Sequence, residues 1–200
     1  QGLGMISSIL VLLLTFQITR AGITRPRGWM PFWAPVFLTA TGAFTYHAVT
    51  GLETQLFTLA VTAAVFFFLR RSRAALALSA LCFLAATLTR PEGLPLFILS
   101  LLFLIGWWSQ RDEDFSSLLL FALLYALPLA VFLLWRHSTF GQWLPNTYWA
   151  KSGPLMNRLP QGAAYTWRFF SQAGALIPWF GIFIPLLWYR LRPRELYLVL

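Results

Sequence analysis

The sequence predicts an all-α fold, a polytopic bundle of transmembrane helices with about seven full spans and the start of an eighth. Two observations lead to this prediction. Apolar residues make up 58% of the 200 residues and charged residues only 10%, against roughly 45–50% and 25% in soluble domains. The apolar residues also fall into long runs separated by short charged or turn-rich segments. A soluble fold could not cover so much apolar surface, so disordered chains, nucleic-acid-binding folds and disulfide scaffolds are excluded.

Seven apolar runs are expected to cross the membrane, and an eighth begins near Leu196. A hydrocarbon core of about 30 Å needs roughly 20 helical residues. Several runs hold only about 15 or 16 residues, so either the bilayer thins locally or their flanking motifs dip into its boundary. In chain order the runs are Leu3–Thr19, Trp29–Val49, Thr54–Leu69, Ala74–Thr89, Leu94–Trp108, Phe115–Trp135 and Gln172–Tyr189.

Charged or turn-forming residues separate these runs. The arginine-rich segment Arg20–Arg27 lies between the first and second runs, and Gly51 permits a tight turn before the third. Arg70–Arg73 follows the third run. Pro91 suits the start of the fifth helix because its missing N–H costs nothing there. The charged segment Arg111–Asp114 precedes the sixth run.

The arginines that give the chain its net charge of +9 are grouped between the apolar runs, which is typical of topology signals. Ten basic residues lie on one side and five on the other, so the side with ten is predicted to be cytoplasmic. Gln1 then starts outside, as do Thr50–Glu53, Arg90–Gly93 and a long external loop over Arg136–Ser171. In that loop, Ala163–Phe170 suits a helix along the outer interface. Residues 1–200 are expected to be one transmembrane domain, a piece of a longer protein.

Polar groups cluster at the outer ends of the predicted spans. The span interiors contain no Asp, Glu, Lys or Arg, which weakens the interpretation as a proton-coupled transporter. The first outer motif, Thr50–Thr54, carries Glu53, a residue that also suits a helix N-terminus. The second motif, Thr89–Gly93, carries Arg90 and Glu92. These two residues fit either a solvated ion pair at a helix junction or a phosphate-binding arginine with its carboxylate.

The third outer motif, Leu144–Lys151, combines aromatic residues with Asn146, Tyr148 and the only lysine, Lys151. Aromatic faces and hydrogen-bonding side chains suit a sugar ring, although aromatic residues are also common at membrane interfaces. The sequence contains no nucleotide-binding loop and no tight metal-ligand spacing.

These motifs, TGLET at Thr50–Thr54, TRPEG at Thr89–Gly93 and LPNTYWAK at Leu144–Lys151, resemble in order and sidedness the bacterial polytopic glycosyltransferases of the GT-C superfold. The resemblance covers most of the chain. It is closest to members that use polyprenyl-phosphate sugars, such as the terminal arabinofuranosyltransferases, and more distant to protein mannosyltransferases. It implies a multi-pass enzyme of the bacterial plasma membrane. Such an enzyme moves a sugar from a polyprenyl-phosphate donor to an acceptor glycan, lipid or protein on the outer face, without a nucleotide.

The resemblance also implies roles for individual residues. The catalytic Asp of such enzymes lies in the first outer loop, which is expected upstream of Gln1. A divalent cation is a further implied component. The implied donor-phosphate ligands are Arg90 and Lys151, the sugar-binding or ordering residues are Asn146 and Tyr148, and the supporting carboxylates, which would orient these groups or help to hold the cation, are Glu53 and Glu92.

Two other functions stay open. A lipid or sugar transporter or flippase would place polar groups along its spans, or contain interrupted helices in related halves. A non-catalytic membrane subunit would bind a lipid or a partner enzyme. The residues just upstream of Gln1 would separate these possibilities, because an outer loop with an Asp pair there favours the enzyme.

Overall fold

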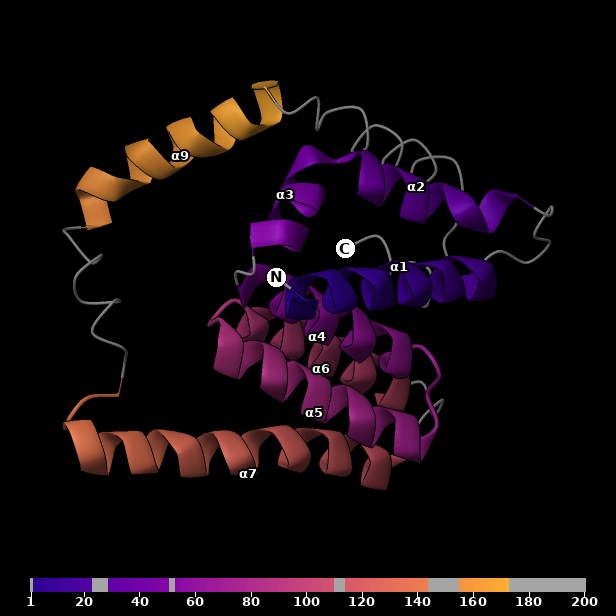
Figure 1. Cartoon of the computed structure of the whole chain (residues 1–200). Helices are drawn as coiled ribbons and strands as arrows, with labels where there is room; N and C mark the ends of the chain where they lie inside the picture. The colour runs from indigo at the N-terminus through magenta and orange to yellow at the C-terminus, as the bar shows by residue number, and fades with distance from the viewer. Residues whose placement is uncertain (1, 23–28, 51–52, 110–113, 144–154, 173–200) are drawn as a thin grey trace. The chain divides into compact units, whose positions relative to one another are not determined.

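The computed structural model describes residues 2–22, 29–50, 53–109, 114–143 and 155–172, and helices make up 91% of these residues, with no strand among them. The chain forms two compact units, Gln1–Val131 and Phe132–Leu200. The helices are α1 (Gly2–Gly22), the 3-10 turn η1 (Met30–Phe32), α2 (Trp33–Ala40), α3 (Gly42–Thr50), α4 (Glu53–Phe68), α5 (Arg73–Thr89), α6 (Gly93–Ser109), α7 (Phe115–Phe140) and α9 (Leu155–Gln172) (Figure 1).

Five of the predicted spans correspond to single helices: α1, α4, α5, α6 and α7. The second, expected over Trp29–Val49, does not. It is divided into η1, α2 and α3, with a break at Thr41, whose backbone is extended (φ −77°, ψ 117°). The Thr41 hydroxyl and backbone N–H both donate to the Leu38 carbonyl, at 2.6 and 3.2 Å. These bonds end α2, and Gly42 then begins α3 in a new direction.

The length of each helix limits whether it can cross a membrane by itself. Only α1, with 21 residues, and α7, with 26, are long and apolar enough among the described helices. Helices α3 and α4 would together make a third span, but they are bent by 115° at their junction, as in a broken span or a re-entrant loop. Helices α5 and α6 have 17 residues each. In the residues that the structure describes, the fold is therefore helical, and two or three segments are long and apolar enough to cross a membrane. The seven-span bundle stays a prediction.

In the first unit, α4 and α5 form an antiparallel pair, with α1 beside α4 and α6 beside α5 (Figure 1). A buried hydrogen bond joins the pair, since the Ser79 hydroxyl donates to the Ala64 carbonyl at 2.8 Å. The first half of α7 adds an aromatic core with α4, α5 and α6. Ring centroids lie 5.1 to 6.4 Å apart from Phe121 to Phe68, Phe83 and Phe97.

One end of the α4–α5 pair carries the basic turn Arg70–Arg73. Arg71 adopts a positive φ of 58° there, and its guanidinium lies 4.3 Å from the centroid of the Trp107 ring. The Arg70 guanidinium lies 4.1 Å from the Phe66 ring. Ser72 caps α5, because its side-chain oxygen accepts from the Ala75 N–H at 3.2 Å. Three arginines therefore gather at this end of the unit.

The external loop expected over Arg136–Ser171 contains more helix than predicted. Helix α7 continues through Arg136 and His137 to Phe140, because a charged residue by itself does not end a helix. Helix α9 includes the expected interface helix, Ala163–Phe170, and begins eight residues earlier. The seventh expected span, Gln172–Tyr189, lies almost entirely outside the described residues, and the eighth, expected from near Leu196, lies wholly outside them.

Candidate functional site

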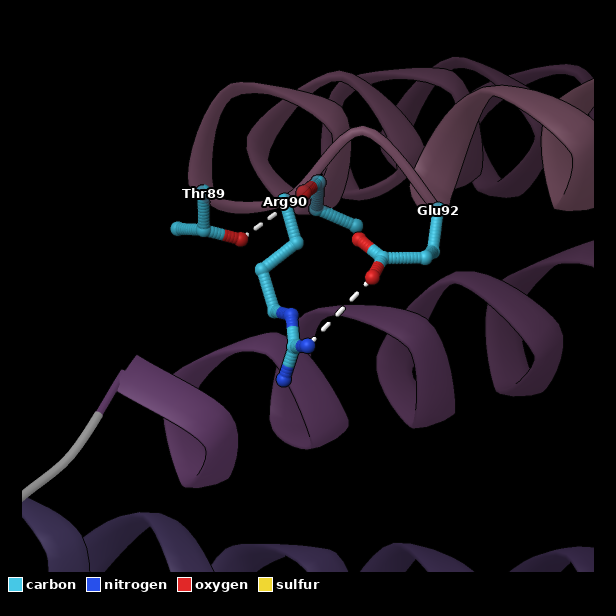
Figure 2. Close-up of polar contacts among 4 residues, drawn as sticks. Thr89, Arg90 and Glu92 are labelled. Atoms are coloured by element: carbon cyan, nitrogen blue, oxygen red, sulfur yellow. Dashed lines mark hydrogen bonds and ion pairs between the residues drawn. The ribbon is translucent and has the colours of Figure 1, made fainter. Parts of the chain in front are cut away.

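The second motif forms a hydrogen-bonded turn between α5 and α6. Arg90 is extended (φ −148°, ψ 136°), as is usual for a residue that precedes proline. Its backbone N–H donates to the Ala86 carbonyl at 2.8 Å, and its carbonyl accepts from the Gly93 N–H at 3.1 Å. The Thr89 hydroxyl also donates to Ala86, at 2.7 Å (Figure 2). These bonds fix the backbone from which the Arg90 side chain projects.

Gly93 makes this turn compact. The residue is buried at the start of α6, and a Cβ atom there would lie 2.5 Å from the Thr87 nitrogen and 2.8 Å from the Ala86 carbonyl carbon. Both atoms belong to the α5 backbone, which cannot move aside as a flexible side chain can. Glycine at position 93 therefore allows the first turn of α6 to contact the last turn of α5.

The Arg90 guanidinium projects toward α4 and is held from two sides. Its Nη2 atom donates to the Glu92 carboxylate at 3.3 Å (Figure 2). Its central carbon lies 5.6 Å from the centroid of the Phe57 ring, within the range of a cation–π contact. The Arg90 side chain is 35% exposed and that of Glu92 is 58% exposed. An arginine has five N–H donors, so the contact with Glu92 leaves donors for a ligand.

The contact with Phe57 relates the first motif to the second. Glu53 and Phe57 are four residues apart in α4, so they share one helix face. Because the Arg90 guanidinium lies against Phe57, the start of α4 and the α5–α6 turn meet at one end of the first unit. The basic turn Arg70–Arg73 lies at the opposite end of α4. The structure thus brings Arg90 and Glu92 into direct contact, with Glu53 on a neighbouring helix turn.

Two contacts join this end to α3 and α1. The Gln55 side chain, only 2% exposed, donates to the Phe44 carbonyl at 2.8 Å and so links α4 to α3. A Cβ atom on Gly4 would lie 2.6 Å from the Ala48 carbonyl oxygen, so α1 and α3 approach closely there. The His47 Nδ1 and Gln55 Oε1 atoms are buried without a hydrogen-bond partner among the described residues.

The third motif is not placed by the structure. Asn146, Tyr148 and Lys151 lie outside the described residues, so their relation to Arg90 stays a prediction. Within the described ranges, no group of three His, Cys, Asp or Glu residues could hold a metal ion. The divalent cation therefore also stays a prediction.

Sequence reasoning missed Phe57 and Gln55 as parts of this end, and it placed Gly93 in the second motif without a packing role. Phe57 could have been found from its spacing to Glu53, since residues four apart share a helix face. Gln55 is a polar residue in an apolar run, which is itself a signal. Nothing in the sequence pattern indicates that Gly93 contacts the α5 backbone.

No family model, curated protein or solved structure matches this chain in the comparisons with known proteins. The resemblance based on the three motifs therefore stays a prediction.

Proposed function

We propose that this chain is part of a membrane glycosyltransferase that moves a sugar from a polyprenyl-phosphate donor to an acceptor glycan, lipid or protein on the outer face. One observation carries the proposal: the partly exposed guanidinium of Arg90 lies at one end of the helical unit, away from the basic turn Arg70–Arg73. Under the positive-inside rule, the basic turn faces the cytoplasm and Arg90 faces outward.

Arg90 is suited to bind the donor phosphate. A planar guanidinium donates two parallel N–H bonds to a phosphate, which a lysine cannot do. Glu92 and Phe57 restrict the side chain before the donor arrives, so less conformational entropy is lost on binding. In the reaction, the acceptor hydroxyl oxygen bonds to the anomeric carbon as the bond from that carbon to the phosphate oxygen breaks. A carboxylate base takes the hydroxyl proton, and Arg90 stabilises the phosphate that leaves.

Apolar side chains near the same turn favour a lipid-linked donor over a soluble one. Leu88 is 48% exposed just before the turn, and Leu94 and Ile98 are 41% and 46% exposed just after it. A prenyl chain that packs against these side chains would place its phosphate near Arg90. In the same proposal, Lys151 is a second phosphate ligand. The further proposed roles are sugar binding or ordering for Asn146 and Tyr148, and support of the basic groups by Glu53 and Glu92.

A transporter or flippase is the second candidate, and the bend of 115° between α3 and α4 favours it. Interrupted helices are common in transporters, where they line the substrate site. Gln55, buried next to this bend, is a polar residue of the kind that such a site uses. A flippase would move a polyprenyl-phosphate sugar between leaflets without any transfer to an acceptor.

The test is a transfer assay with the complete protein in membranes, supplied with undecaprenyl-phosphate sugars labelled in the sugar, one sugar at a time. We expect Arg90→Ala to lower the rate about 100-fold, the usual cost of losing one donor to a developing oxyanion. Arg90→Lys should retain only part of the rate, because it keeps the charge but loses the paired N–H bonds.

Arg73→Ala is the matched control, since Arg73 is an exposed arginine at the opposite end of the unit. It should leave the rate within about twofold of the unchanged protein, given that surface charges away from a site contribute little. A normal rate in Arg90→Ala would overturn the phosphate role. If the labelled sugar moves to the other leaflet but is never transferred to an acceptor, the result would favour the flippase.

A further inference from the structure

Helix α9 differs from every other described helix in having two distinct faces. The helices α1 and α5 to α7 are apolar on all sides, whereas α9 is polar on average and has one apolar side. Leu159, Ala163 and Trp167 follow one another at intervals of four residues and form its apolar face. Gln161 and Arg168 lie on the polar face, seven residues apart.

The apolar face is uncovered within the part of the chain that the structure describes. Leu159 is 59% exposed and Trp167 is 74% exposed. Tyr165, on the polar side, is also 74% exposed. Large apolar side chains that stand open on one side of a helix mark a surface that binds something else.

The charges on α9 indicate what that surface binds. Its sequence holds two arginines, Arg158 and Arg168, and no acidic residue. A helix with basic residues on its polar face and Trp and Leu on the other is typical of helices that lie in the plane of a bilayer surface. The positive charge is complementary to anionic lipid headgroups.

The position of α9 in the chain also favours a bilayer surface as its binding partner. Residues 141–154 are all that separate it from the end of α7, a helix long and apolar enough to cross a membrane. A connection of this length allows α9 to lie at the bilayer surface. The helix also contains Pro160 and Gly162, both poor helix formers, so its stability in this protein depends on a surface that binds its apolar face.

We propose that α9 binds the surface of an anionic bilayer, with Leu159, Ala163 and Trp167 toward the acyl chains and Arg168 among the headgroups. The proposal is independent of the glycosyltransferase function, because it concerns how one helix binds the membrane surface and not how a donor is bound.

The experiment places a nitroxide label on two adjacent alanines of the complete protein in lipid nanodiscs. Ala163 lies on the apolar face, and Ala164 lies on the polar face with Gln161 and Arg168. Each is replaced by Cys in a background without other cysteines, in which Cys82, the only cysteine of residues 1–200, is replaced by Ala. Collisions of the label with oxygen, which concentrates in lipid, and with a water-soluble nickel chelate are measured by power-saturation spectroscopy.

In nanodiscs that contain phosphatidylglycerol, we expect the oxygen-to-nickel accessibility ratio at position 163 to be about threefold higher than at 164, because only the apolar face of such a helix enters the acyl boundary. In nanodiscs of phosphatidylcholine alone, the ratio at 163 should fall toward that at 164. Equal ratios at the two positions in anionic lipid would overturn the proposal. A label at position 163 that is immobile and shielded from both reagents would also overturn the proposal, because protein would then cover the apolar face. A ratio at 163 that does not respond to lipid charge would overturn the role of anionic lipid.

Discussion

Phe121→Ala should destabilise the first unit more than any other single truncation in its core, by about 3–5 kcal/mol, the usual cost of a Phe→Ala change at a buried site. The Phe121 side chain is completely buried. Its ring lies 5.1 Å from Phe97 and 5.7 Å from Phe68, measured between centroids. These rings come from α7, α6 and α4, so the substitution leaves a cavity where three helices meet.

The measurement is the thermal unfolding midpoint of the purified protein in detergent micelles, with Leu127→Ala as the control. Leu127 is on the same helix but is 60% exposed, so its truncation should change the midpoint by much less. If both substitutions lower the midpoint equally, the arrangement of α4, α6 and α7 described here is wrong.

Gly93→Ala should have the second largest effect, although it adds only one methyl group. The new Cβ atom would meet the α5 backbone at 2.5 Å, so α5 and α6 would have to separate. Overpacking of this kind costs about 1–3 kcal/mol. Because Arg90 and Glu92 lie in the same turn, we also expect the transfer rate to fall as their geometry changes.

Gly106→Ala provides a matched control in the same helix. A Cβ atom at Gly106 meets nothing within 4 Å, and alanine is favoured over glycine in a helix interior by roughly 0.5–1 kcal/mol. The unfolding midpoint should therefore fall for Gly93→Ala and stay level or rise for Gly106→Ala. A fall of equal size in both variants would contradict the close contact between α5 and α6.

The short helices were the elements best predicted from the sequence. The bounds expected for the fourth and fifth runs lie within one residue of α5 and α6, because the charged segment Arg70–Arg73 and the Arg90–Gly93 turn interrupt the apolar sequence at the helix ends. The break at Thr41 was missed because Thr and Gly in an apolar run do not distinguish a kink from a continuous span. The length of α7 was missed because Arg136 was treated as an end, although arginine is a good helix former.

The candidate site was predictable only where its residues are close in sequence. The pairing of Arg90 with Glu92 follows from a spacing of two residues across a turn. The contact between Arg90 and Phe57 depends on the antiparallel packing of α4 on α5, which no local pattern specifies. The roles given to Asn146, Tyr148 and Lys151 are predictions from the sequence alone.

The central claim is that a polyprenyl phosphate binds at the Arg90 end of the first unit, and photo-crosslinking from α4 tests it most directly. Phe57 and Phe66 are a matched pair on this helix. Both are half-buried, and each has an arginine guanidinium over its ring, Arg90 at 5.6 Å and Arg70 at 4.1 Å. They lie about 13 Å apart along the axis, at a rise of 1.5 Å per residue. Each is replaced in turn by benzoylphenylalanine in the complete protein, and a radiolabelled undecaprenyl-phosphate sugar is added before illumination.

We expect crosslinked lipid at position 57 to exceed that at position 66 about tenfold, a ratio equivalent to about 1.4 kcal/mol of preference for one end. The excess at position 57 should disappear when Arg90→Ala is added. Equal labelling at the two positions, stronger labelling at 66, or labelling at 57 that survives the loss of Arg90 would contradict the account.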